Sequence, residues 1–171
     1  MHELLLLRHA KSRWDEPEAG DHDRDLTSRG ERAAAAIGKF LRKSDLVPDL
    51  VLCSSARRAR RTWQLVAEAL RHDPPLKELR SLYLATPGRL LEIVRRQNPA
   101  VRRLLLVGHN PGMASLASRL AGEGEADELA RMEEKFPTAA LARLTFTGDG
   151  WREAGQGRFR LDRFVRPRDL D

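Results

Sequence analysis

The chain has 171 residues, of which 41% are hydrophobic and 33% charged, and its formal net charge is +6. This composition is typical of a globular domain and excludes a disordered chain. The apolar runs at 4–7 and 104–108 are too short to cross a bilayer, and Arg8 and His9 interrupt the first before it could act as a signal peptide. The single cysteine, Cys53, excludes an internal disulfide and fits a reducing compartment. We therefore expect one domain, residues 1–171, in the cytoplasm and away from membranes.

Short apolar runs and amphipathic segments alternate along the first two thirds of the chain. Three runs have the character of strands buried on both faces: Leu4–Leu7, Asp49–Cys53 and Leu104–Val107. Apolar residues at helical spacing, with a capping Thr-Pro pair before one of the segments, predict helices over 28–43, over 57–71, from Thr86-Pro87 onward, and over 113–121. This order predicts an α/β fold, a three-layer α/β/α sandwich around a mostly parallel sheet.

The last part of the chain has a different pattern. Ala140–Phe146 and Phe159–Val165 are strand-like, and glycine-containing turns at 148–150 and 155–157 separate them. We expect these two C-terminal strands to extend the sheet and to lie at its edge.

Three of the predicted strands end in residues suited to binding phosphate. The first runs into Arg8-His9, the second into Ser54–Ala59, and the third into Gly108–Gly112. We expect the serines of the second segment and Asn110 of the third to cap the helices that follow. In open α/β sheets ligands bind at the carboxyl ends of the strands, where helix N-termini attract anions.

This placement predicts that Arg8, His9, Arg58 and His109 converge on one anion-binding crevice. Arg57 is the alternative to Arg58, because adjacent residues differ by about 100° around a helix. Taken singly, each group also has a structural interpretation: a hydrogen-bonded histidine, a solvated arginine face, a helix cap. Their occurrence at the same topological place in successive βα units favours a common site.

The basic charge leaves one alternative of a different class, a nucleic-acid-binding domain. Such a domain could use the arginine-rich stretch 57–61 together with Arg95, Arg96, Arg102 and Arg103. The sequence lacks a recognisable binding motif, and one tyrosine and five phenylalanines offer little for base stacking. We therefore expect no nucleic-acid partner.

Four motifs occur in order between residues 4 and 112. They are Arg8-His9-Ala10 after a strand, the Arg-x-Leu-Thr-x-x-Gly pattern at 24–30, Ser-Ser-x-x-Arg-Ala-x-x-Thr at 54–62, and Val-Gly-His-Asn at 107–110. Together they resemble the histidine phosphatase superfamily, also called phosphoglycerate mutase-like, and within it the small SixA-type phosphohistidine phosphatases. Ala10 and Ser55 replace the glycine and proline that are usual in the family.

The resemblance implies a phosphatase in which His9 attacks phosphorus and forms a transient phosphohistidine, while Arg8, Arg58 and His109 surround the phosphoryl oxygens. It implies no metal and no cofactor. Larger relatives use a glutamate to protonate the leaving group; Glu78 lies at a comparable distance along the chain, but a solvated position is the favoured interpretation.

The resemblance defines the reaction more closely than it defines the substrate. Only 48 residues lie between His9 and Arg58, and 50 between Arg58 and His109, which leaves little chain for a lid. An open site favours phosphohistidine on a protein surface. A small phosphomonoester or sugar phosphate is the alternative, and a phosphoglycerate mutase-like phosphotransferase is a third possibility.

Overall fold

The computed structural model describes residues 1–170 and is built on one seven-stranded sheet. The strand order is β3 (Leu76–Leu79), β2 (Leu50–Ser54), β4 (Arg103–Gly108), β1 (His2–Arg8), β6 (Leu141–Phe146), β7 (Phe159–Val165) and β5 (Ala121–Gly124). The pairings are parallel except those of β6, which is antiparallel to both β1 and β7. The sheet is therefore mostly parallel, as predicted.

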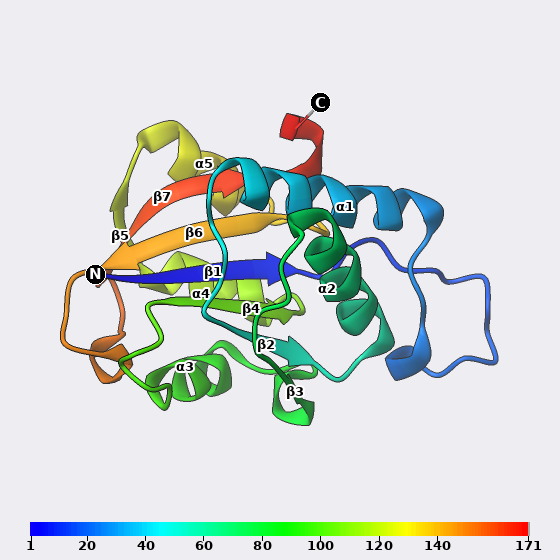
Figure 1. Ribbon diagram of the computed structural model, residues 1–171, viewed down its shortest axis with the longest axis horizontal. Helices are drawn as coiled ribbons and strands as arrows, with labels where there is room; N and C mark the ends of the chain where they lie inside the picture. The colour runs from blue at the N-terminus through cyan, green and yellow to red at the C-terminus, as the bar shows by residue number, and fades with distance from the viewer. Residues whose placement is uncertain (171) are drawn as a thin grey trace.

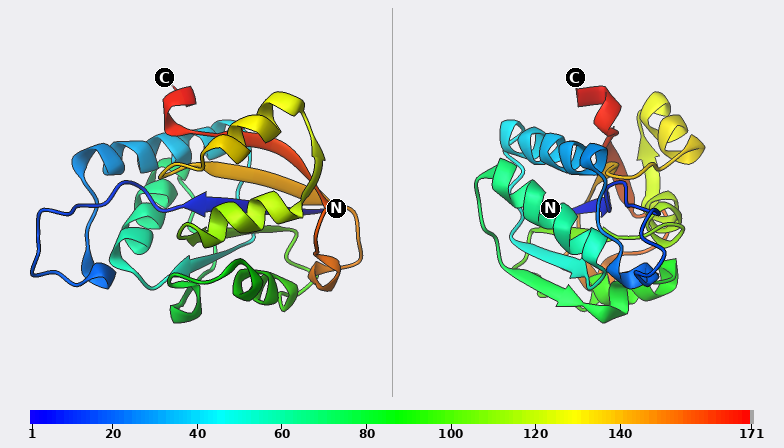
Figure 2. Two further views of the ribbon diagram at one scale, coloured as in Figure 1. Left: turned by 180° about the vertical axis from the view of Figure 1, so that it is seen from behind. Right: turned by 90° about the vertical axis from the view of Figure 1, so that its right-hand side faces the viewer.

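Helices cover both faces of this sheet and complete the three layers. On one face, α1 (Ser28–Lys43) packs along α2 (Arg57–Leu70), while α3 (Pro87–Arg95), α4 (Gly112–Leu120) and α5 (Ala126–Glu134) cover the other. The end-on view in Figure 2 shows the two helical layers with the sheet between them. Within residues 1–170, no helix combines the length and the apolar character needed to span a membrane.

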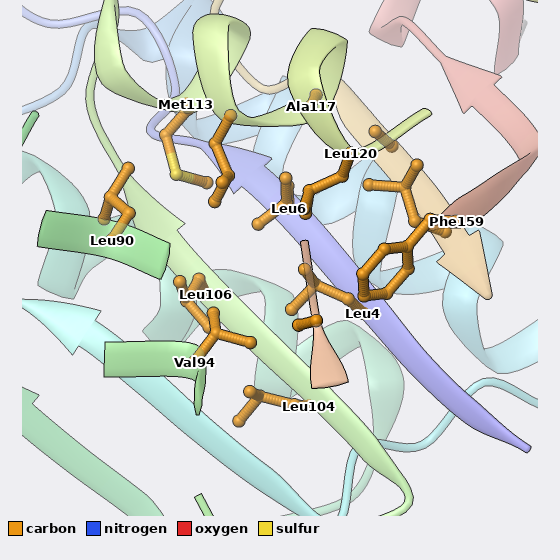
Figure 3. Close-up of a cluster of buried hydrophobic side chains, with 14 of the residues drawn as sticks. Leu4, Leu6, Leu90, Val94, Leu104, Leu106, Met113, Ala117, Leu120 and Phe159 are labelled. Atoms are coloured by element: carbon orange, nitrogen blue, oxygen red, sulfur yellow. The ribbon is translucent and has the colours of Figure 1, made fainter. Parts of the chain in front are cut away.

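The side chains of β1 alternate between two cores. Leu4 and Leu6 face α3 and α4, whereas Leu5 and Leu7 face α1 and α2, and all four are fully buried. Figure 3 shows the first core, where leucines of β1 and β4 meet Leu90, Met113 and other side chains of α3 and α4. Burying one such leucine contributes about 2 kcal/mol, so the central strands are fixed from both sides.

The predicted helices are confirmed closely: α1 has the expected bounds, and α3 begins at Pro87 behind Thr86, whose side chain accepts a hydrogen bond from the Arg89 N–H. The two C-terminal strands extend the sheet beyond β1 toward one edge, as predicted. The two buried faces of β6 place it between β1 and β7, and the short β5 is outermost. No sequence pattern predicted β3, β5 or α5, and the segment 121–124, Ala-Gly-Glu-Gly, carries no strand pattern.

Candidate active site

A pocket of about 350 Å³ lies at the carboxyl ends of β1, β2 and β4, the end at which the loop 9–27 projects in Figure 1. The four residues predicted from the strand ends all line it: Arg8, His9, Arg58 and His109. They are separated by up to 101 residues in sequence, and parallel strands bring them together because their carboxyl ends share one edge of the sheet.

His9 is the most constrained of these side chains. Its backbone N–H donates to the Gly108 carbonyl at 3.0 Å, and its Nδ1 lies 2.8 Å from the Ala10 carbonyl. A carbonyl only accepts, so Nδ1 carries the proton and Nε2 keeps its lone pair. Burial lowers the pKa of His9 to about 3, and the positive groups around it, Arg58 and Arg8 among them, act in the same direction. The ring is therefore neutral at physiological pH.

His109 is held in the opposite tautomer. Its Nδ1 lies 3.4 Å from an Arg58 Nη2, which can only donate, and its Nε2 lies 2.7 Å from the Ser54 hydroxyl. Burial, followed by the charge of Arg58, lowers its pKa to about 4. With the pocket in this form His109 is neutral, because the ring is desolvated and the positive charges of Arg58 and Arg8 are close.

Arg58, rather than Arg57, faces the pocket. Its side chain is only 2% exposed, and its guanidinium donates to the Asp21 backbone carbonyl at 2.6 Å and to the Asp21 carboxylate at 3.1 Å. Arg57 is half exposed and pairs with Asp25 at 3.0 Å. Hydrogen bonds from Tyr83, then Arg58 and Arg24, hold the pKa of Asp21 at about 2, so this carboxylate is ionised.

The pocket has an excess of positive charge. Four cationic side chains line it, Arg8, Lys11, Arg24 and Arg58, against the carboxylate of Asp21. The Nε atoms of Arg8 and Arg58 are buried without a hydrogen-bond partner among the described residues. Buried donors without an acceptor are costly, and both guanidinium groups line the pocket, where their charge would attract the oxygens of a bound anion. The arrangement fits a phosphoryl group beside the free Nε2 of His9.

The comparisons with known proteins identify the family of this chain. The model of "Histidine phosphatase superfamily (branch 1)" matches residues 4–82. A solved protein of Agrobacterium tumefaciens, described as a candidate phosphohistidine phosphatase SixA, is 32% identical, with a TM-score of 0.81 and coverage of 96% of this chain and 97% of that one. This chain belongs to the histidine phosphatase superfamily.

Two further relatives show how far the similarity extends within the superfamily. An uncharacterized protein of Mycobacterium tuberculosis is 40% identical over 167 residues, which cover 95% of this chain and the whole of that protein. A 2,3-bisphosphoglycerate-dependent phosphoglycerate mutase of Streptomyces griseus is 40% identical over 70 residues, which cover 40% of this chain but 28% of the mutase. The similarity to the first spans the fold, whereas that to the mutase is confined to a part of it.

The histidine phosphatase motifs have identifiable structural roles in this chain. The Thr62 hydroxyl accepts from the Ala10 N–H at 2.9 Å and donates to the Arg58 carbonyl at 2.7 Å, so it ties the segment after β1 to the first turn of α2. Thr27 caps α1 by accepting from the Gly30 N–H at 2.9 Å. A side chain at Gly30 would lie 2.2 Å from the Lys11 carbonyl, so only glycine permits this approach.

Two expected helix caps differ in detail from the structure. Ala56 is the N-cap of α2 and makes no side-chain bond, while the Ser54 hydroxyl accepts from the Ala56 N–H at 3.2 Å and from His109. The serine therefore orients the second histidine instead of capping the helix. Asn110 precedes α4 and accepts from the Ala114 N–H at 3.2 Å, while its amide donates to the Phe136 carbonyl at 2.9 Å.

Glu78 does not line the pocket. It lies on the edge strand β3, half exposed, and pairs with Arg60 at 3.0 Å. This agrees with the solvated position favoured from the sequence. Among residues 1–170, Asp21 is the one carboxylate that lines the pocket, and it is ionised.

Arg24 is one of the pocket residues that no local sequence pattern singled out, and Asp21 is another. Arg24 is 9% exposed, donates to the Ser12 hydroxyl and to Asp21, and its guanidinium lies 3.6 Å above the ring of Trp14. Its place in the Arg-x-Leu-Thr motif was noted as a resemblance only, because no strand end or helix cap marks the position. An antiparallel β-bridge between Ser12 and Leu26 brings the segment that carries Arg24 back to the pocket.

The arginines that suggested nucleic-acid binding are largely engaged within the protein. Arg57, Arg60 and Arg61 pair with Asp25, Glu78 and Glu31, and Arg58 is buried in the pocket. Arg103 pairs with Glu3. These ion pairs neutralise much of the positive charge that the stretch 57–61 would need to bind a nucleic-acid backbone.

Proposed function

We propose that this phosphatase transfers a phosphoryl group to Nε2 of His9 and takes it from phosphohistidine on a protein. The single observation that carries the proposal is the neutral, Nδ1-protonated His9 beside buried, incompletely bonded arginines. A nucleophile needs an available lone pair, and phosphoryl transfer depends mainly on positioning and on stabilising charge at the phosphoryl oxygens.

The steps follow from these positions. The Nε2 lone pair attacks phosphorus in line, an N–P bond forms, and the bond to the leaving group breaks with its electron pair departing on that group. The Ala10 carbonyl stabilises the positive charge that develops on the ring by accepting from Nδ1. A water molecule then attacks phosphorus, the N–P bond electrons return to Nε2, and inorganic phosphate leaves. Arg8 and Arg58 bind the phosphoryl oxygens throughout.

The leaving group is the part of the substrate that this site constrains most. Asp21 is ionised and Glu78 faces away, so neither can donate a proton to a departing alkoxide. The imidazole of a phosphohistidine departs without such a donor when its ring is protonated, and an aryl oxide departs as a stabilised anion. The site therefore favours phosphohistidine and aryl phosphates over alkyl esters such as sugar phosphates.

Turnover on a panel tests this order. We expect kcat/KM to be highest for a phosphohistidine peptide, lower for para-nitrophenyl phosphate, and lower still for glucose 6-phosphate. Equal or higher kcat/KM on the sugar phosphate would favour the alternative, a phosphatase of small phosphomonoesters. Efficient exchange of phosphate between phosphoglycerates would instead favour a mutase-like phosphotransferase.

Metal independence is part of the proposal. The protein supplies the positive charge that a metal ion supplies in other phosphatases, and residues 1–170 hold no cluster of three His, Cys, Asp or Glu side chains that could bind one. We expect full activity in EDTA, and a loss restored by Mg²⁺ or Zn²⁺ would contradict this. The cytoplasm remains the expected compartment.

A further inference from the structure

A second hollow of about 440 Å³ adjoins the catalytic pocket, and Lys11 and Thr138 line both. Six cationic side chains line it, here called the basic groove: Lys11, Arg29, Arg131, Lys135, Arg166 and Arg168. We propose that the basic groove binds an acidic segment of the phosphorylated protein, beside the residue whose phosphoryl group enters the catalytic pocket. This inference rests on the proposed function, and it specifies that the partner protein is acidic beside its phosphorylated residue.

The charge of the groove is only partly neutralised by the protein. Arg131 pairs with Glu128 and Asp169, and Arg166 pairs with Asp169. The other four cations, Lys11, Arg29, Lys135 and Arg168, are exposed and have no ion pair among residues 1–170. Glu134 is the one acidic residue in the lining, so an excess of positive charge remains for a ligand.

The groove is connected to the catalytic machinery by its wall. Lys135 and Thr138 flank Phe136, whose carbonyl accepts from Arg8 at 3.1 Å. Ala139, which follows Thr138, donates its N–H to the His9 carbonyl at 3.0 Å. A chain that places a phosphorylated side chain against His9 and leaves the pocket past Thr138 and Lys11 enters the groove.

The distribution of the cations favours an extended acidic segment over a second phosphoryl group. They come from the loop after β1, from α1, from α5 and the segment after it, and from the C-terminal segment. A single phosphoryl group is bound by converging, buried donors, as in the catalytic pocket, where Arg58 is 2% exposed. Exposed cations spread over an open groove match carboxylates spaced along a peptide.

The test compares matched peptides. Two phosphohistidine peptides of equal length carry either glutamates or glutamines beside the phosphorylated residue, and two phosphotyrosine peptides carry the same flanks. For the wild-type protein we expect kcat/KM to be about five- to tenfold higher with glutamate flanks at low salt, and the difference to shrink at 0.5 M NaCl. The variant Arg29→Gln/Lys135→Gln should lose most of this preference.

The control variant is Lys77→Gln/Arg152→Gln. It removes two exposed cations, one on β3 and one in the short helix Trp151–Glu153. It should keep the preference. Both variants should hydrolyse para-nitrophenyl phosphate as the wild type does, because none of the four residues lines the catalytic pocket. Unchanged thermal unfolding excludes a folding defect.

The outcomes separate this inference from the proposed function. If phosphohistidine peptides resist hydrolysis while the phosphotyrosine pair shows the glutamate preference, the leaving-group assignment fails and the groove proposal stands. Equal kcat/KM on both flanks in the wild type overturns the groove proposal, whichever phosphoryl group is cleaved. Inhibition by single-stranded DNA that the groove variant loses, without any flank preference, assigns the groove to nucleic acid and also overturns it.

Discussion

Two regions of the molecule contribute to the pocket in different ways. Residues 1–112 form the strands β1, β2 and β4, and they supply the side chains that face the phosphoryl position, His9, Arg58 and His109 among them. The C-terminal region, from β5 to β7, contributes mainly backbone: the Phe136 carbonyl binds Arg8 and Asn110, and the Ala139 N–H binds the His9 carbonyl.

This difference shows where sequence identity matters for the chemistry. A side-chain role restricts the residue type, whereas a backbone carbonyl or N–H can be supplied by almost any residue held in the right place. The first region therefore carries readable motifs and the second does not, although both fix the position of His9. The predictions below test this division, from the largest expected effect to the smallest.

Replacing His9, the proposed nucleophile, should abolish turnover. His9→Ala removes the atom that forms the N–P bond, so we expect kcat to fall by about 10⁴-fold or more and no phosphoenzyme to be trapped. His109→Ala should lower kcat by about 10²–10³-fold yet still permit slow labelling of His9, because it removes the acceptor that helps to position the Arg58 guanidinium while the nucleophile stays in place. Rapid denaturation without acid, followed by mass spectrometry, measures both.

The bond itself identifies the nucleophile. A phosphohistidine is labile in acid and stable in base, unlike a phosphoserine ester. Label on Ser12, Ser54 or Ser55 in the wild-type protein would contradict the assignment of His9.

Arg57 and Arg58 provide a matched pair within the first region. Arg58→Ala removes a buried donor of the pocket, and we expect kcat/KM for para-nitrophenyl phosphate to fall by about 10²–10³-fold. Arg57→Ala removes an exposed side chain that pairs with Asp25, so we expect a change of at most about twofold. Similar losses in both variants would show that the overall charge of α2, and not the geometry of one guanidinium, determines activity.

The two buried histidines should make stability depend on pH. The pKa of His9 is about 3 in the folded protein and about 6.5 when unfolded, so between these values the unfolded chain binds more protons. Stability is therefore lost as the pH falls below about 6.5, by about 2 kcal/mol between pH 7 and 5 for each histidine held neutral. Urea unfolding of the wild type and His9→Gln should show a shallower pH dependence in the variant.

An equal pH dependence in the two proteins would mean that His9 is protonated in the fold. The same low pKa predicts that His9 itself causes no loss of kcat/KM between pH 5 and 8. A loss of activity there would have to come from the substrate or from another group.

The extent to which the sequence predicted the structure follows the same division. Alternating apolar runs and helical spacing were enough to place β1, β2, β4 and four helices, because each buries a continuous set of leucines or alanines. They were also enough to bring Arg8, His9, Arg58 and His109 to one edge. The neutral state of His109 depends on burial and on the charge of Arg58, which lies 51 residues away in sequence, and the inward turn of Arg24 depends on its contacts with Ser12 and Trp14. The interior position of β6 depends on pairing, which a local pattern does not contain.

Asn110 joins the two regions, and its replacement should lower activity less than the replacement of Arg58 does. Its amide donates to the same Phe136 carbonyl that Arg8 binds, and its side-chain oxygen accepts from the Ala114 N–H. Asn110→Ala removes one of the two bonds that fix the Phe136 carbonyl, so the acceptor that positions Arg8 is held less firmly. We expect kcat/KM to fall by about tenfold, equivalent to about 1.4 kcal/mol. The other asparagine, Asn98, accepts from the Ala100 N–H in an exposed turn, so Asn98→Ala controls for the loss of an amide. Wild-type activity in Asn110→Ala would show that the C-terminal backbone positions Arg8 without this link.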